Sequence, residues 1–389
     1  MAKTKKQPEH VTTCKALLGE KAKQDVNSLE ARLYSFAEHI SEIATEHQKR
    51  VIKFFPEYDL HDEIHINKVE ENIAKLIGEK RMKELCGYEL FLLSAGSLLH
   101  DVGMAPTDWE ENLLKITEGT ENLYEWEESI KHDGKKPYDK EQARIFISKN
   151  KDSIYDFNKL KESPFAPSTE DELLDEYADL LVRYQSFRNG NSDKLKSASN
   201  LDEFKKINEE VRREFLRQNH HECSHRYVMH LEKCFKSKNG CQGLDIASRI
   251  AEDLANICKA HGENLSFIEE LKYGEQYDKE QVVNLQFVAE MVRLGDIIHF
   301  SKDRTPVVLQ SAIDFKSSFS QGQWDIKSET QLKYEIKDGM VIFTTDKIKK
   351  PGHYYALKDY IGWVNGEIDN YIRLSHNWDE KSLVSTNKC

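Results

Sequence analysis

The most constraining feature of the sequence is an apolar segment, about residues 88–101, that ends in His100 and Asp101. Apolar residues fall on almost every side of this segment, which predicts a helix that is buried on all faces. An imidazole and a carboxylate at the end of such a helix are costly to bury unless they bind something. Adjacent helical residues point about 100° apart, so one ion beside the helix end could contact both side chains.

The rest of the chain is predicted to be mainly α. Apolar residues recur at steps of three and four, which is typical of amphipathic helices. Such segments cover 28–55, 63–79, 209–235, 244–260, 280–298 and 354–375. Strand candidates are 323–326, 331–336 and 340–345, and Asp338 and Gly339 form a hairpin turn between the last two.

The polar segment 104–205 differs from the segments around it. It carries short helical runs separated by loops, which predicts an insertion or cap on the surrounding core. The predicted domains are therefore a helical domain, 28–310, with this insertion, and a C-terminal extension, 311–389. The extension combines a β-hairpin and an amphipathic helix.

Composition restricts the class of protein. No apolar stretch approaches the roughly 18–20 residues of a membrane span, and no apolar core follows the basic N-terminus, so neither a membrane protein nor a secretory signal is indicated. Seven cysteines without CxxC pairs favour free thiols in a reducing cytoplasm. The net charge of −12 makes duplex nucleic acid an unfavourable partner.

Five places along the chain carry residues that suit metal binding. They supply six candidate ligands, namely His65, His100, Asp101, His220, His261 and Asp296. Each place lies on or beside a separate predicted helix, as in metal sites of helical bundles. Mixed nitrogen and oxygen ligands favour iron, manganese, zinc or nickel over calcium or magnesium alone, with magnesium kept as an alternative.

The same residues resemble the signature of the HD superfamily of metal-dependent phosphohydrolases. His65, the His100–Asp101 pair and Asp296 match its order, and His220 and His261 look like the two extra histidines of its six-ligand subset. The stretches LLHDVGM, RQNHHECS and VRLGDIIHFSKDRTP are similar to the HD-CE branch. This resemblance implies an HD-type helical bundle that holds two divalent ions. The first would bind His65, His100, Asp101 and Asp296, and Asp101 would bridge to a second ion at His220 and His261.

The resemblance also implies an activity and a partner. The expected reaction is hydrolysis of a nucleotide or a related phosphate ester, with Asp101 positioning the ions. Arg217, Arg293 and Arg304, together with Lys302, are candidates for binding the substrate phosphate. HD enzymes with a lysine soon after the His–Asp pair use it near the nucleophile, whereas this chain has Val-Gly-Met there. HD-CE proteins are often linked to Hsp90-like ATPases, and no ATPase motif is visible in the sequence.

Other interpretations remain open. The protein could be a nucleotide sensor that signals to an ATPase partner, or a di-iron oxygenase with the same ligand set. The run from His221 to His225 spells the HExxH motif of zinc proteases, but that interpretation leaves His100, Asp101 and Asp296 unexplained. His221 is the alternative ligand if the helical register is shifted by one residue. The sequence leaves open a homodimer and does not identify the substrate.

Overall fold

The structure is a computed structural model of the chain. It describes residues 11–58, 63–118, 139–237, 246–278, 281–301, 304–305, 310–311, 313, 318–329, 332–337, 340–345, 348 and 350–378. The chain divides into two compact units: Met1–Asp101 with Asn256–Cys389, and Val102–Ala255. Each unit is described separately. The predicted domain boundaries at 104, 205 and 310 remain predictions.

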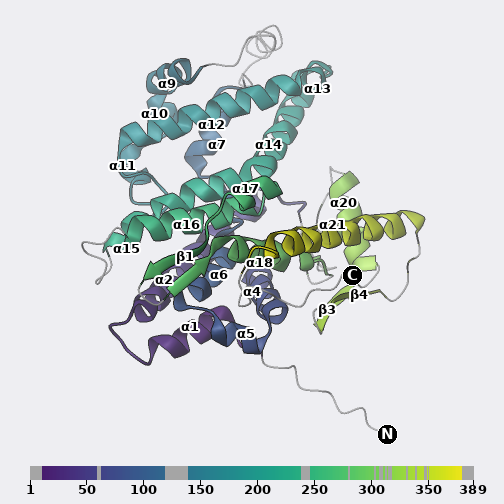
Figure 1. Cartoon of the computed structure of the whole chain (residues 1–389). Coiled ribbons are helices and arrows are strands. Elements are labelled where there is room, and N and C mark those ends of the chain that lie inside the picture. Colours follow the sequence, from purple (N-terminus) through teal and green to yellow (C-terminus); the bar gives the residue numbers. More distant parts are fainter. Residues whose placement is uncertain are drawn as a thin grey trace. The chain divides into compact units, whose positions relative to one another are not determined.

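The first unit is a helical bundle with two small antiparallel hairpins (Figure 1). Its elements are α1 (Cys14–Ala22), α2 (Leu29–Gln48), α3 (Val51–Phe54), α4 (Glu63–Ile77), α5 (Glu79–Glu84), α6 (Gly87–Leu99), α17 (Leu265–Glu269), β1 (Tyr273–Asp278), β2 (Gln281–Asn284), α18 (Leu285–Ile298), α20 (Ser318–Glu329), β3 (Lys333–Lys337), β4 (Met340–Thr344) and α21 (Pro351–Ser375). The last residues of α16 (Ile246–Ala260) also belong to it. The predicted mainly α fold with a C-terminal hairpin and helix is confirmed.

Helix α6 forms the centre of the first unit. All of its residues are buried, and it packs against α1, α2, α4 and α18. A capping box between Cys86 and Glu89 starts the helix by satisfying free backbone N–H groups. At Gly96, a side-chain methyl would lie 3.0 Å from Ile257 and 3.2 Å from Val292, so glycine lets the neighbouring helices approach closely. The continuous apolar character of this segment therefore reflects burial on all sides.

The C-terminal segment combines a confirmed hairpin with one wrong prediction. Strands β3 and β4 pair in the register Lys333 with Thr344 and Lys337 with Met340. The predicted turn at Asp338 and Gly339 lies outside the described residues. The predicted strand 323–326 is part of helix α20. There Trp324, Lys327 and Ser328 are buried on one helical face, and the Trp324 indole donates to the Glu57 carbonyl at 2.9 Å.

The second unit is entirely helical in its described residues. It contains the 3₁₀ turn η1 (Val102–Met104), α7 (Asp108–Ile116), α9 (Lys140–Lys149), α10 (Lys151–Ile154), α11 (Phe157–Leu160), α12 (Glu170–Gly190), α13 (Ser192–Lys196), α14 (Leu201–His230), α15 (Glu232–Ser237) and most of α16. Helix α14 is continuous over 30 residues. The predicted helical run 209–235 falls largely within it, and the predicted insertion 104–205 ends inside this single helix.

Turn η1 packs directly against α14. The Gly103 N–H donates to the Ser224 hydroxyl at 2.8 Å. A side-chain methyl at position 103 would lie 2.1 Å from the His220 carbonyl oxygen, which is closer than any real contact. Position 103 therefore requires glycine.

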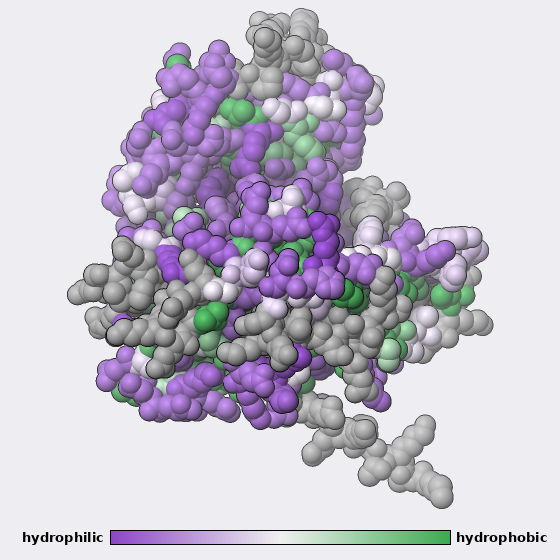
Figure 2. All heavy atoms as spheres, in the orientation of Figure 1, coloured by the Kyte–Doolittle hydropathy of each residue, from purple (hydrophilic) through white to green (hydrophobic). Residues whose placement is uncertain are grey.

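The surface agrees with the high content of charged residues. Figure 2 shows mainly hydrophilic residues on the visible face, with apolar residues in small separate areas. In the part of the chain that the structure describes, no helix combines the length and the apolar character that crossing a bilayer requires.

Candidate metal centre

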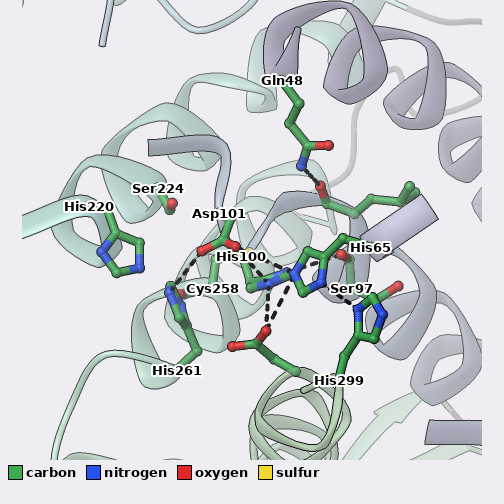
Figure 3. A network of polar contacts seen from close by, with 12 residues as sticks. Gln48, His65, Ser97, His100, Asp101, His220, Ser224, Cys258, His261 and His299 are labelled. Carbon is green, nitrogen blue, oxygen red and sulfur yellow. Dashed lines mark hydrogen bonds and ion pairs between the residues drawn. The ribbon is translucent and has the colours of Figure 1, made fainter. Parts of the chain in front are cut away.

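Four of the six predicted ligands form a compact cluster in the first unit. His65 lies on α4, His100 and Asp101 follow α6 directly, and Asp296 lies on α18. The His65 Nε2 is 3.4 Å from Asp296 Oδ1, and the His100 Nε2 is 3.2 Å from Asp101 Oδ2. The four ligand atoms all lie within 4.8 Å of one another. Helices α4 and α6 and the distant helix α18 therefore bring nitrogen and oxygen donors together (Figure 3).

His261 adds a third imidazole on the other side of Asp101. Its Nε2 lies 3.6 Å from Asp101 Oδ1, whereas Asp101 Oδ2 faces His65 at 3.7 Å and His100 at 3.2 Å. The two oxygens of Asp101 thus face different imidazoles. This arrangement is the one that a bridging carboxylate requires.

Backbone carbonyls orient two of the three rings. The Nδ1 of His100 faces the Ser97 carbonyl at 3.0 Å, and the Nδ1 of His261 faces the carbonyl of Cys258. Because a carbonyl only accepts, each Nδ1 must carry a proton, and Nε2 is the nitrogen through which each ring can bind a metal ion. His65 differs, because its Nδ1 faces the Nδ1 of His299 at 2.9 Å.

The cluster is buried and strongly charged. His100 is fully buried, and His65 and Asp101 are 2% and 5% exposed. Burial alone would lower the pKa of His100, but the carboxylates of Asp101 and Asp296 raise it well above its ordinary value. Burial would raise the pKa of Asp296, but hydrogen bonds with His100 and His65 hold it well below its usual range. Without an ion, the negative carboxylates are compensated by protons on histidine, and a divalent cation could replace that positive charge.

The donor set fits a divalent metal ion. Buried carboxylates and imidazoles are expected to be paired or to coordinate metals, and this cluster supplies both ligand types at close range. Mixed imidazole and carboxylate donors suit iron, manganese, zinc and nickel. The ligand atoms of this cluster are therefore suitable for binding a metal ion. They do not determine how many ions bind or which metal is bound.

Of the predicted phosphate-binding residues, Arg293 has a different environment from the one expected. Its guanidinium donates to the Glu367 carboxylate of α21 and to the carbonyls of Ala260 and Glu263. These contacts join α18, α21 and the segment that carries His261. Arg293 thus helps to hold these elements together, and its part in phosphate binding stays a prediction.

The other predicted site residues are placed as follows. Arg304 makes a long contact of 3.5 Å with the His299 carbonyl in the first unit. Arg217 and His220 lie on α14 of the second unit, where Arg217 forms an ion pair with Glu214. Their part in the centre stays a prediction. Lys302 lies outside the described residues.

The zinc-protease interpretation finds no support. His221 and His225 are one helical turn apart on α14. Among the described residues, no group that could hold a metal ion contains both of them.

Sequence reasoning missed the side chains that support the ligands. His299 contacts His65, and Asn72 on α4 donates to the Gly295 carbonyl at 2.9 Å, directly before Asp296. Tyr334 on β3 donates to the Asn72 side chain at 2.9 Å. His299 had one available signal, because it follows the candidate ligand Asp296 by three residues. Asn72 and Tyr334 had none, since only the fold brings them to α18.

The fold and the cluster define a helical-bundle protein with a buried histidine–aspartate centre of the type that binds metal ions. The HD-CE family model matches residues 55–370, and the chain therefore belongs to the HD-CE family. The resemblance predicted from the motifs is confirmed. No curated protein and no solved structure matches the chain.

Proposed function

We propose that the protein is a metal-dependent phosphohydrolase that acts on a nucleotide or a related phosphate ester. The observation that carries this proposal is the arrangement around Asp101, where one buried carboxylate faces His65 and His100 with one oxygen and His261 with the other. Phosphoryl transfer is favoured by cations held close together at the reacting phosphate.

The chain's residues divide into distinct roles in this proposal. His65, His100, Asp101 and Asp296 would hold one divalent ion, and Asp101 and His261 would contribute to holding a second. By the family resemblance, His220 is the further ligand of the second ion. Ions bound in this way supply two effects: they lower the pKa of a water ligand toward neutrality, and they neutralise phosphoryl oxygens. The Nδ1 contacts of His100 and His261 leave Nε2 as the nitrogen of each ring that would bind an ion.

Arg304 is the proposed phosphate-binding residue of the first unit. A guanidinium matches the oxygens of a phosphate group in a bidentate manner. Arg304 contacts the backbone at His299, which in turn contacts the ligand His65. Arg217 remains a second proposed residue. A cytoplasmic location and an Hsp90-like ATPase partner are proposals that come from composition and from the family resemblance.

The test combines metal analysis with a substrate screen. Purified wild-type protein is expected to contain a divalent transition metal and to release phosphate or nucleotide from at least one member of a panel of nucleotides and phosphate esters. His100→Ala is expected to lose both metal and turnover. His39→Ala is the matched control, because His39 lies on α2 and belongs to no candidate ligand group among the described residues.

Two results would contradict the proposal. Turnover that stops when oxygen is removed would instead identify an oxygenase. Nucleotide binding without turnover, retained in Asp101→Ala together with regulation of a partner, would identify a sensor.

A further inference from the structure

His299 lies directly beside the proposed ligand His65. It follows the last residue of α18 and is 2% exposed. The two Nδ1 atoms are 2.9 Å apart, the ring planes differ by 11°, and the ring centroids are 5.1 Å apart. These values are those of two rings that meet nitrogen to nitrogen in nearly the same plane, and Figure 3 shows the rings joined in this way.

A hydrogen bond between two identical nitrogens leaves the position of the proton open. If His65 carries its proton on Nδ1, it donates to His299, and the His65 Nε2 keeps a lone pair that faces Asp101 and Asp296. If His299 donates instead, the neutral His65 must carry its proton on Nε2. A protonated Nε2 cannot bind a metal ion. The proton between these two rings therefore decides whether His65 is a ligand.

This situation distinguishes His65 from the other two imidazoles of the first unit. His100 and His261 face backbone carbonyls, which accept and never donate. Their proton positions are fixed by the main chain, whereas that of His65 depends on a side chain.

Tyr334 packs against His299 and connects it to α4 and α18. The Tyr334 ring on β3 meets the His299 ring at a centroid distance of 6.1 Å and an angle of 62°. The Tyr334 hydroxyl donates to Asn72, and the Asn72 amide donates to the carbonyl of Gly295. The C-terminal hairpin therefore contacts both His299 and the part of α4 that faces α18.

We infer that His299 is a positioning residue of the metal centre, which accepts the Nδ1 proton of His65 and so directs the His65 Nε2 lone pair toward the ion. The Tyr334 ring holds His299 in the orientation that accepts this proton. The inference rests on the proposed metal site. It means that tight metal binding requires His299 in addition to the metal ligands themselves.

Two substitutions at position 299 distinguish two roles of the His299 side chain: accepting the His65 proton and filling the space beside His65. His299→Phe keeps a ring of similar shape beside His65 and Tyr334 but removes the acceptor. His299→Asn supplies a carbonyl oxygen near the position of Nδ1 and so restores the acceptor. The control is His353→Phe, a buried histidine on α21 that belongs to no candidate ligand group.

The first measurement is titration of the metal-free proteins with Co²⁺, followed by its visible absorption and by calorimetry. Loss of a side chain that orients a metal-ligating histidine costs about 10–100-fold in affinity. We expect a loss of this size for His299→Phe, and affinities close to wild type for His299→Asn and His353→Phe. If His299→Phe does not fold, His299→Leu removes the acceptor with a smaller side chain.

The second measurement uses the Zn²⁺-loaded protein, because Zn²⁺ is diamagnetic. NMR of this protein with nitrogen-15-labelled histidine is expected to show the His65 Nδ1–H proton far downfield, as in a strong hydrogen bond, in wild type and in His299→Asn. In His299→Phe the proton is expected to move upfield, because no acceptor faces the His65 Nδ1. The His65 signals are assigned by their loss in His65→Gln.

The outcomes separate this inference from the proposed function. Wild-type Co²⁺ affinity in His299→Phe, or an unchanged His65 Nδ1–H resonance, would overturn the role of His299. If wild-type protein binds Co²⁺ and Zn²⁺ but hydrolyses no phosphate ester, the proposed function fails. The metal affinities and the NMR resonance would then still decide whether His299 accepts the proton of His65.

Discussion

At Gly103, the turn that follows the His100–Asp101 pair lies so close to α14 that no side chain fits. We expect Gly103→Ala to reduce the free energy of unfolding by about 2–3 kcal/mol, because the added methyl group would overlap the His220 carbonyl and the Ser224 N–H. Urea unfolding followed by fluorescence measures the change.

Gly190→Ala is the matched control in the same unit. Gly190 ends α12, and a methyl group there would meet nothing within 4 Å. We expect a change within about 0.5 kcal/mol. Equal effects of the two substitutions would contradict the close packing of η1 against α14.

Asp101 is the residue whose charge matters most to the centre, because its oxygens face three imidazoles. We expect Asp101→Asn, which keeps the shape and removes the charge, to weaken binding of a divalent metal by about 100-fold or more. Calorimetric titration with Mn²⁺ or Zn²⁺ gives the affinity.

Asp253→Asn serves as the control for this change. Asp253 is a largely buried acid on α16 that belongs to no candidate ligand group. If both variants keep wild-type metal affinity, Asp101 is not a ligand.

At the residue scale, most of the histidine–aspartate cluster could be predicted from the sequence. The reason is that only a few residue types bind metal ions, and their order along the chain is visible in the sequence. His65, His100, Asp101 and Asp296 come together as expected. The environment of Arg293 could not be foreseen, since its partner Glu367 lies 74 residues further along the chain. His299 contacts a residue 234 positions away, and no local pattern encodes such a contact.

Helices α18 and α21 are joined by a buried acidic pair. Burial, and then the neighbouring Glu367 carboxylate, raise the pKa of Glu290 well above its ordinary value. Burial would also raise the pKa of Glu367, but its hydrogen bond with Arg293 lowers it. Glu290 therefore keeps its proton in the folded protein at a pH where the unfolded chain loses it. The folded state binds more protons, so this group makes stability fall as the pH rises from the ordinary carboxyl range toward the raised pKa.

Glu290→Gln removes this pH dependence because the amide is neutral in both states. We expect the variant to gain stability relative to wild type as the pH is raised from about 5 to about 8. Thermal unfolding across this range tests the expectation. Glu335→Gln, at an exposed position on β3, is expected to follow wild type at every pH. A wild-type pH profile for Glu290→Gln would show that Glu290 is ionised in the folded protein.

At the element scale, periodicity identified the long helices and the last two strands. It failed for 323–326, where alternating apolar residues suggested a strand while burial follows the helical spacing of Trp324, Lys327 and Ser328. It also missed the hairpin β1–β2, because the residues of β2 run directly into α18 and share its apolar character. The side chain of Asn284 accepts from the Phe287 N–H and starts α18 after this strand.

On the scale of the whole molecule, the first unit holds five of the six candidate ligands, and they link α4, α6, α18 and the end of α16. A ligand that binds only the folded protein adds stability, about 2.7 kcal/mol at a concentration one hundred times its Kd. We therefore expect removal of metal by a chelator to lower the unfolding temperature of the wild-type protein.

His100→Ala provides the control for metal removal. Its unfolding temperature is expected to be the same with and without the chelator, because it lacks the site. A wild-type unfolding temperature that does not respond to metal would show that the ligand cluster holds no ion in solution.

The position of Asp101 has a consequence for how the proposed centre would fill. In a two-ion centre, its buried carboxylate would be the ligand that both ions share. Each ion would then reduce the negative charge available to the other, and the two cations would repel each other. For such a centre, we expect the first ion to bind more tightly than the second, so that calorimetric titration shows two separate steps.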